Sequence, residues 1–413
     1  MFDSEAHFIR FAAMTTAPNA KLHPAIIPLM AVAAGVTVAN IYYNQPILND
    51  IGESVHASGS EIGKVSMFAQ LGYGLGMFFL IPLGDKVNRK RLILLLSTLL
   101  MITLAGFSFA TKLYQVYALS LFVGLFATSA QILMPMAATL DSVNRGKTVG
   151  KVFSGILVGI LGARVIAGLI AGWLGWRYVY GISAGMVLIV AILLKLYLPN
   201  VPPKFKGNYV GLLKSALSLV GEFKILRQAA LLGFFTFGIF CSFWTTLTFH
   251  LSNAPLNFSA STIGLFGFIA IGGALVAPWF GKLADKGNIH RSLLISVGMI
   301  IGSVILLKVF PYSIVALIIA IFFLDIGVQA TQITNFARIY ALDEHAHSRL
   351  NTIYMTTYFI GGSAGTYFGL LSWKMGEWNM STWQMLLWGV IAIAIVMISK
   401  GRTSIPQKAE LNK

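Results

Sequence analysis

Long apolar runs recur along almost the whole chain, and they constrain its fold more than any other feature. Each run is close to the roughly 20 residues with which an α-helix crosses a bilayer, and short polar segments separate the runs. Only 11% of the 413 residues are charged, against about 25% in a soluble domain. Because backbone groups in lipid must be satisfied within each helix, we expect an all-α integral membrane protein with twelve transmembrane helices, at 25–46, 62–82, 92–110, 114–138, 151–173, 177–198, 228–250, 262–281, 292–309, 312–335, 351–372 and 380–399.

The basic residues indicate which side of the membrane the loops face. A formal net charge of +16 is by itself compatible with nucleic-acid binding. With the expected helices, however, 24 of the 30 lysines and arginines fall in loops on the side of the termini, and five fall on the opposite side, at Lys64, Lys112, Arg177, Lys308 and Lys374. The positive-inside rule therefore predicts cytoplasmic termini and a cytoplasmic central loop, with the lipid bilayer and not nucleic acid as the partner.

The sequence has few features of export processing or redox chemistry. Residues 1–23 lack the basic start, continuous apolar core and small-residue cleavage site of a signal peptide, so we expect the first transmembrane helix to direct insertion. Cys241 is the single cysteine and falls inside an expected helix. It excludes an intrachain disulfide and a cysteine-cluster metal site, and we expect no metal or cofactor.

The longest polar break divides the expected helices into two groups of six. It covers 199–228 and includes several lysines and an amphipathic segment around 210–220. A linker lying on the membrane surface explains this segment better than a regulatory domain does. The expected organisation is an N-terminal segment (1–24), a six-helix bundle (25–198), a linker (199–227), a second six-helix bundle (228–399) and a tail (400–413).

The two halves repeat each other weakly. The loop PLGDKVNRKRL (82–92) is echoed by GKLADKGNIHRSL (281–293), which places Asp85 and Asp285 200 residues apart. A second echo relates Gln131 to Gln332 at nearly the same offset. Two pseudo-symmetric six-helix bundles are typical of secondary transporters. Convergent loop chemistry is the alternative, since basic cytoplasmic turns are common.

The first of these loops resembles a signature of the major facilitator superfamily, G-x-L-A-D-R-x-G-R-K/R. The matching residues are Leu83, Gly84, Asp85, Lys86, Arg89, Lys90 and Arg91, with a second copy at Gly281, Leu283, Ala284, Asp285 and Lys286. The stretches ANIYYNQPIL (39–48), GWRYVY (175–180) and ARIYALDEHAHSRLNTIYM (337–355) are similar to a bacterial efflux subgroup that includes sugar and nucleoside exporters. The resemblance implies a monomer in the bacterial inner membrane that exports its substrate as protons enter.

The resemblance also implies roles for residues at the cytoplasmic side. Asp85 and Arg89 would form a latch between helices that is closed in the outward-facing state and broken in the other, with Asp285 as its second copy. The alternative is that this charge only sets topology, which we favour for Lys86 and the bases at 90 and 91. Paired glycines on the second, fifth and eleventh helices let backbones approach closely, and some of these faces would slide during transport.

Two opposite charges lie well inside expected helices. Asp325 is the one acid and Arg164 the one base in such a place. Because a lone charge in hydrocarbon costs at least about 2.5 to 3.5 kcal/mol, we expect them to be partners. Their depths are compatible, roughly 20 Å and 15 Å from the cytoplasmic ends of their helices. Either Asp325 takes up a proton and releases Arg164 to meet an anionic or polar substrate, or the pair is a permanent structural bridge.

In the superfamily fold, the first, fourth, seventh and tenth helices line the central cavity. Polar or aromatic residues on these helices are Asn40, Tyr43, Asn44, Gln131, Trp244 and Gln329. Aromatic rings with a few amides suit a neutral or amphipathic organic molecule. Each residue taken alone is also explained by packing or by an interfacial position.

Other classes of function fit less well. The nearest P-loop lookalike, DSVNRGKT (141–148), has Asp141 where the first glycine must be, which excludes an ATP-driven pump on this chain. A membrane-embedded enzyme would need a cluster of catalytic side chains, and the histidines fall in loops or at helix ends without an HExxH motif. We therefore expect no enzyme but a secondary transporter with alternating access that exports a drug, sugar or nucleoside with proton coupling; a uniporter or importer remains the alternative.

Overall fold

The computed structural model describes residues 25–141, 145–203, 207–269, 289–343 and 346–399. These residues are almost entirely helical, and no strand occurs among them. Nine of the described helices are long and apolar enough to cross a membrane. One of the nine, α18 (His347–Ile398), holds two of the expected spans, because its backbone leaves the helical region at Gly376 and Glu377.

The N-terminal half contains the first six expected spans. Its helices are α2 (Ile26–Ala39), α4 (Gly59–Ile62) followed by α5 (Lys64–Lys86), α6 (Arg89–Ser108), α7 (Leu113–Ala127) followed by α8 (Ser129–Leu140), α9 (Arg145–Leu174) and α10 (Trp176–Tyr197). The C-terminal half contains α12 (Lys224–Ser252), α13 (Ala260–Leu265), α16 (Ile289–Val309), α17 (Ile314–Tyr340) and α18. Helix α13 begins the eighth span, most of which lies outside the described residues. Together these elements give the twelve-helix architecture.

The first span is shorter than expected. We expected a continuous helix over 25–46, but α2 ends at Ala39 and a turn leads to η1 (Gln45–Ile47) and α3 (Leu48–Ser54). The Asn40 Nδ2 atom donates to the carbonyl oxygens of Val36 and Thr37 at 2.8 and 3.1 Å. A side chain that binds helix carbonyls competes with the backbone, and the proline of η1 cannot donate to the turn before it.

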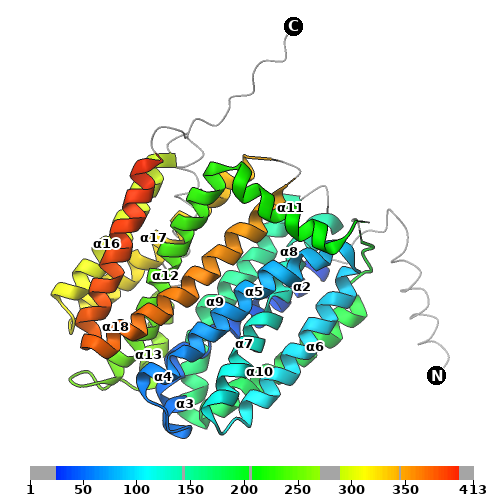
Figure 1. The fold of residues 1–413 in the computed structure, drawn as a ribbon. Helices are drawn as coiled ribbons and strands as arrows, with labels where there is room; N and C mark the ends of the chain where they lie inside the picture. Colours follow the sequence, from blue (N-terminus) through cyan, green and yellow to red (C-terminus); the bar gives the residue numbers. More distant parts are fainter. Residues whose placement is uncertain (1–24, 142–144, 204–206, 270–288, 344–345, 400–413) are drawn as a thin grey trace.

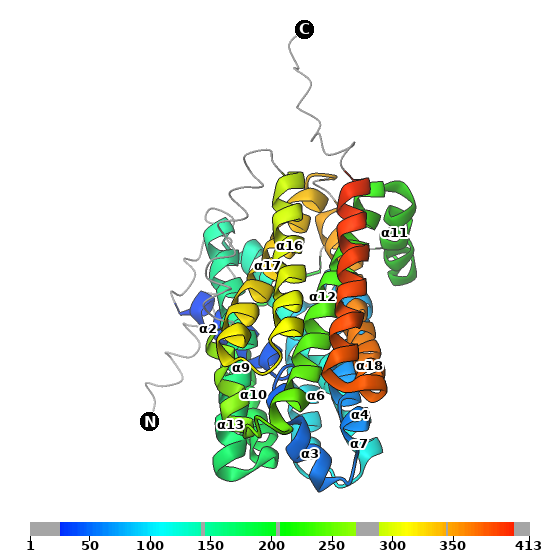
Figure 2. The same ribbon diagram turned by 90° about the vertical axis from the view of Figure 1, so that its left-hand side faces the viewer.

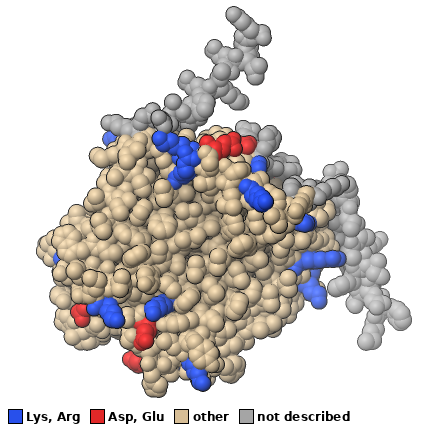
Figure 3. Space-filling view, viewed as in Figure 1, with Lys and Arg blue, Asp and Glu red and all other residues tan. Residues whose placement is uncertain are grey.

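The two halves lie side by side, with the linker helix across one end of the molecule (Figure 1). This helix, α11 (Tyr209–Glu222), buries Leu212, Ala216 and Leu219 and packs on α5 and α18. Helices α3 and α4 lie at the opposite end in both views (Figure 2). On the face drawn in Figure 3, charged side chains gather toward these two ends and leave a wide area without them, as a bilayer requires.

The glycine pairs have two different uses. Gly72 on α5 packs against α7, and Gly155 on α9 packs against α2, so these pairs join helices of one half. Gly168 on α9 instead faces Gly264 on α13, across the boundary between the halves. A Cβ atom at Gly264 would lie 2.7 Å from the Arg164 carbonyl oxygen. The halves therefore meet by direct backbone contact near the middle of α9.

Candidate functional site

Arg164 lies at the boundary between the halves and is almost completely buried, with 1% of its surface exposed. Its Nε atom donates to Oε1 of Gln45 at 2.7 Å. Its guanidinium carbon lies 4.1 Å from the ring centre of Trp244 on α12, and 5.4 and 5.5 Å from those of Phe240 and Tyr42. The charge is thus held by one amide and by the faces of aromatic rings, which attract a cation.

Most hydrogen-bonding capacity around Arg164 is unused by the protein. The Nη1 and Nη2 atoms have no hydrogen-bond partner among the described residues, and neither do Nε2 of Gln45 and Nε1 of Trp244. These are four N–H-bearing atoms on three neighbouring side chains. A buried donor without a partner costs free energy, so these neighbouring side chains have donors available for an acceptor.

Asp325 lies on α17 and is also 1% exposed, as its place inside a span predicts. Within the described part of the chain, neither of its carboxylate oxygens has a hydrogen-bond partner. The direct bond that we expected between Asp325 and Arg164 is therefore not formed here, although the two charges interact through space. Arg164 instead turns toward Gln45 and the aromatic rings.

The other residues that we expected to line the cavity differ in their contacts. Asn40 accepts from Ser183 at 2.7 Å and Asn44 accepts from Ser66, so both amides bind inside the N-terminal half. Tyr43 is buried at 3% exposure. Gln131 donates to the Tyr73 hydroxyl at 3.0 Å, and Gln329 is half-buried on α17. Trp244 is the member of this set that the structure brings to Arg164.

Three residues around Arg164 were missed by the sequence analysis: Gln45, Tyr42 and Phe240. Phe240 stands four residues before Trp244 and therefore shares its helix face, which is a signal that the sequence offers. Gln45 stands three residues after Tyr42, in the turn that replaces the end of the first span. Its approach to Arg164 depends on that turn, and no periodicity predicts it.

Arg338 is a further buried base, and it corrects the expected end of the tenth span. We placed Arg338 in a loop beyond the tenth span, but α17 continues to Tyr340 and leaves Arg338 5% exposed. Its Nη1 and Nη2 atoms donate to Asn335 and Gln228 at 3.3 and 3.4 Å. Neutral amides on α17 and α12 thus hold this charge, which burial otherwise disfavours.

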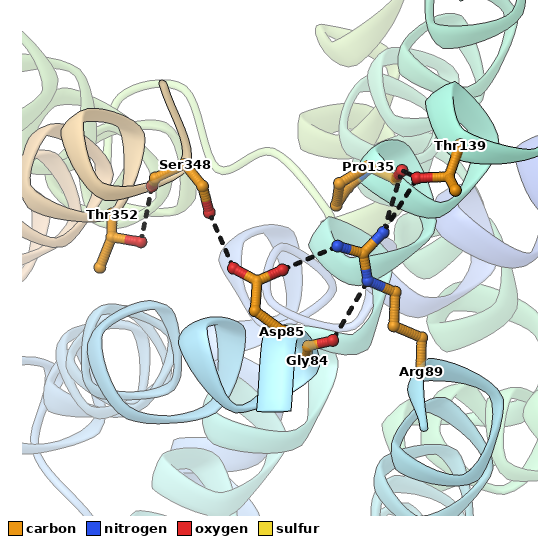
Figure 4. Close-up of polar contacts among 7 residues, drawn as sticks. All are labelled: Gly84, Asp85, Arg89, Pro135, Thr139, Ser348 and Thr352. Carbon is orange, nitrogen blue, oxygen red and sulfur yellow. Dashed lines mark hydrogen bonds and ion pairs between the residues drawn. The ribbon is translucent and has the colours of Figure 1, made fainter. Parts of the chain in front are cut away.

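The bond expected between Asp85 and Arg89 is formed in the N-terminal half (Figure 4). Arg89 donates to Oδ1 of Asp85 at 2.7 Å and to the Gly84 carbonyl at 3.1 Å. It also reaches the Pro135 carbonyl at 3.1 Å and the Thr139 hydroxyl at 3.3 Å, both on α8. The other Asp85 oxygen accepts from Ser348 in the first turn of α18, at 3.5 Å. The cluster therefore touches both halves; Asp285 lies outside the described residues.

A cavity of about 680 Å³ opens at the opposite end, between α3 and the α12–α13 turn. Asp50, Glu53, His56, Phe249 and Trp373 line it, together with other residues of both halves. Partial burial, with a smaller contribution from the Glu53 charge, raises the pKa of Asp50 above its ordinary value.

Gln45 contacts both halves next to this cavity. Its backbone carbonyl accepts from the Thr248 hydroxyl of α12 at 2.8 Å, while its side chain binds Arg164 of α9. Pro46, the next residue, lines the cavity. One short segment thus joins the two halves and contributes to the wall of the cavity.

A bundle of membrane-spanning helices in two halves, with unpaired charges buried where the halves meet, defines a transporter. Comparison with known proteins agrees with this class. The sequence pattern of the Major Facilitator Superfamily matches residues 30–366, and the chain belongs to that family of multi-pass membrane transporters. It is 41% identical to the uncharacterized transporter YgaY of Escherichia coli O157:H7 over 366 residues, which cover 87% of this chain and 92% of YgaY.

Two further similarities are more distant. A protein of Helicobacter acinonychis named "Probable sugar efflux transporter" is 23% identical over 330 residues, which cover 78% of this chain and 82% of that protein. The crystal structure of a bacterial homologue of the human lysosomal transporter Spinster, in an inward-facing and unoccupied conformation, superposes with a TM-score of 0.71 at 16% identity. That match covers 91% of this chain and 96% of the other, and it establishes the shared fold.

Proposed function

We propose that this transporter exports a small organic molecule across the bacterial inner membrane, as a monomer with cytoplasmic termini, and that proton entry drives the export. The observation that carries the proposal is Asp325, a carboxylate buried without a hydrogen-bond partner among the described residues. A buried carboxylate that accepts no hydrogen bonds takes up a proton more readily than a carboxylate whose negative charge is stabilised by several hydrogen bonds. Intramembrane charges of this kind mark transport paths.

Protonation of Asp325 changes the attraction between the two halves at their boundary. When Asp325 is charged, it attracts Arg164 and draws α17 and α9 together. When Asp325 is protonated, Arg164 keeps its bond to Gln45 and loses this attraction. Protonation therefore favours one arrangement of the halves over the other, which is the requirement for coupling.

The ion pair of Asp85 and Arg89, at the end of the molecule near the linker helix, provides a second point at which transport is controlled. Ser348 begins α18 beside Asp85, and Asp85 is held by Arg89. Movement of the first turn of α18 away from α5 would break the weak contact at 3.5 Å and leave the stronger one intact. We propose that this contact forms when the cytoplasmic side closes and is lost when it opens. Export itself is supported by the resemblance to an efflux subgroup and by the name of the Helicobacter relative.

Cellular efflux tests the proposal. Cells that express wild type or Asp325→Asn at equal levels are loaded with small drugs, sugars and nucleosides, and loss of each compound is followed with and without a proton uncoupler. We expect wild type to expel at least one compound, and both the uncoupler and the substitution to abolish this. Glu222→Gln, on the exposed face of α11, is the matched control and should behave as wild type.

Two results would contradict the proposal. Efflux by Asp325→Asn at the wild-type rate under the same gradient would make that carboxylate structural. Accumulation of a compound that depends on the same gradient would show import and reverse the direction.

A further inference from the structure

The centre of the molecule presents two unpaired sets of polar atoms with opposite character. The donor set is Nη1 and Nη2 of Arg164, Nε2 of Gln45 and Nε1 of Trp244; the acceptor set is the two carboxylate oxygens of Asp325. Each of these side chains is at most 2% exposed. None of these atoms has a hydrogen-bond partner in the described part of the chain.

The donor set is held in position by bonds that use other atoms. Gln45 is fixed through its backbone carbonyl by Thr248, and its Oε1 atom accepts from Nε of Arg164. The ring of Trp244 lies under the guanidinium group at 4.1 Å. The free N–H groups are therefore held in place, because rotation of any of the three side chains would break an existing contact.

We propose that this site binds a small zwitterion, a molecule with both a carboxylate and an ammonium group. The carboxylate would accept hydrogen bonds from Arg164, Gln45 and Trp244, and the ammonium group would donate to Asp325. The proposal rests on the proposed function, since it takes this site to be the transport site. Tyr42 and Phe240, whose rings also face Arg164, supply apolar surface for the rest of the molecule.

The presence of both sets argues against a molecule with one charge. An anion would satisfy the donors but would place a second negative charge near Asp325, whose oxygens would stay unpaired. A cation would satisfy Asp325 and leave Nη1 and Nη2 of Arg164 unpaired. Because a buried charge without a partner is costly, both alternatives are weaker ligands than a molecule that carries the two groups.

A zwitterion also provides the competition that antiport requires. The ammonium group needs the negative charge of Asp325, and a proton on that carboxylate removes it. The other titratable groups around the site are Arg164 from α9, Tyr42 from the turn after α2, Cys241 from α12 and Tyr358 from α18. Asp325 carries the carboxyl group of this set, so substrate and proton would compete for one group.

Calorimetric titration of the purified full-length protein tests the inference. The probes are L-alanine, L-leucine and L-phenylalanine, each beside its methyl ester, which keeps the cation, and its N-acetyl derivative, which keeps the anion. We expect at least one amino acid to bind at least about tenfold more tightly than both of its derivatives. Asp325→Asn should remove the advantage over the N-acetyl compound, and Arg164→Gln the advantage over the methyl ester, while Glu222→Gln should change neither.

The outcomes separate this inference from the proposed function. The proposal that the site binds a zwitterion is overturned if a derivative with a single charge binds as tightly as its parent amino acid or more tightly. It is also overturned if none of the three amino acids binds. If efflux of another compound then still requires Asp325 and the proton gradient, the proposed function stands. If an amino acid binds as expected but Asp325→Asn still exports at the wild-type rate, the substrate class stands and the coupling role fails.

Discussion

Arg89 and Arg164 are both buried arginines of the N-terminal half, and their surroundings differ completely. Arg89 binds a carboxylate, two backbone carbonyls and a hydroxyl, which belong to α5 and α8. Arg164 has one hydrogen bond, to Gln45, and its two Nη atoms are free among the described residues. A guanidinium satisfied by its own protein stabilises the fold, whereas one left open is available to a ligand.

The first prediction exchanges each of these arginines for glutamine. We expect Arg164→Gln to reduce transport at least about 100-fold, because the charge that we propose to meet the substrate is lost. Its thermal unfolding temperature should fall less than that of Arg89→Gln, since Arg164 has one hydrogen bond to lose and Arg89 has four. The measurements are the initial efflux rate and the thermal unfolding of the purified protein in detergent.

Arg89→Gln should show the opposite pattern. Asp85 and the α8 carbonyl lose a buried partner, so we expect a destabilisation of about 2 to 4 kcal/mol and a lower unfolding temperature. Transport per folded molecule should fall less than in Arg164→Gln. If Arg164→Gln unfolds well below Arg89→Gln and still transports, the comparison is wrong.

Both arginines are visible in the sequence, but their surroundings are visible only in part. Apolar runs predicted the spans, and the position of Arg164 inside one of them predicted that it is buried. The loop signature predicted that Asp85 and Arg89 lie together. These successes rest on local patterns, namely hydrophobic length and spacing within one loop.

The remaining features depend on contacts that no local pattern encodes. The turn after Ala39 arises from Asn40 binding helix carbonyls, and it brings Gln45 to Arg164 from 119 residues away. The end of α17 was misplaced because a base such as Arg338 is typical of a loop, and here the amides of Asn335 and Gln228 allow it to be buried. Tertiary partners decided both cases.

The second prediction tests whether transport through Arg164 requires the close contact between the two halves. In Gly264→Ala the new Cβ would lie 2.7 Å from the Arg164 carbonyl, and backbone cannot move aside as a side chain can. We expect the contact between α9 and α13 to loosen and the efflux rate to fall about tenfold, in line with overpacking costs of roughly 1 to 3 kcal/mol. Gly302→Ala is the control, because its Cβ would meet no described heavy atom within 4 Å. Equal rates for the two variants would show that this close contact is not part of the cycle.

The third prediction tests whether Arg89 and its partner Asp85 take part in transport. Asp85→Asn weakens the bond to Arg89 and the contact with Ser348, so the population with the proposed closed cytoplasmic side should fall. We expect a loss of transport of about fivefold, which corresponds to roughly 1 kcal/mol. Ser348→Ala removes only the 3.5 Å contact and should lose less than twofold. A larger effect from Ser348→Ala than from Asp85→Asn would place the control in the first turn of α18 and not in the latch.

The smallest effect is expected on the pH dependence of stability, at Asp50, which is partly buried in the wall of the 680 Å³ cavity. Partial burial and then the nearby Glu53 charge raise its pKa in the folded protein above 3.8, so the folded state holds this proton more tightly than the unfolded state does. Stability should therefore be greater below the unfolded pKa, and it should decrease as the pH rises through the window between the unfolded and the folded pKa. Asp50→Asn should flatten this part of the profile and leave efflux through the Arg164 site intact. Thermal unfolding of both proteins from pH 3.5 to 7 measures the difference; a profile that Asp50→Asn does not change would assign the acid dependence of stability to another group.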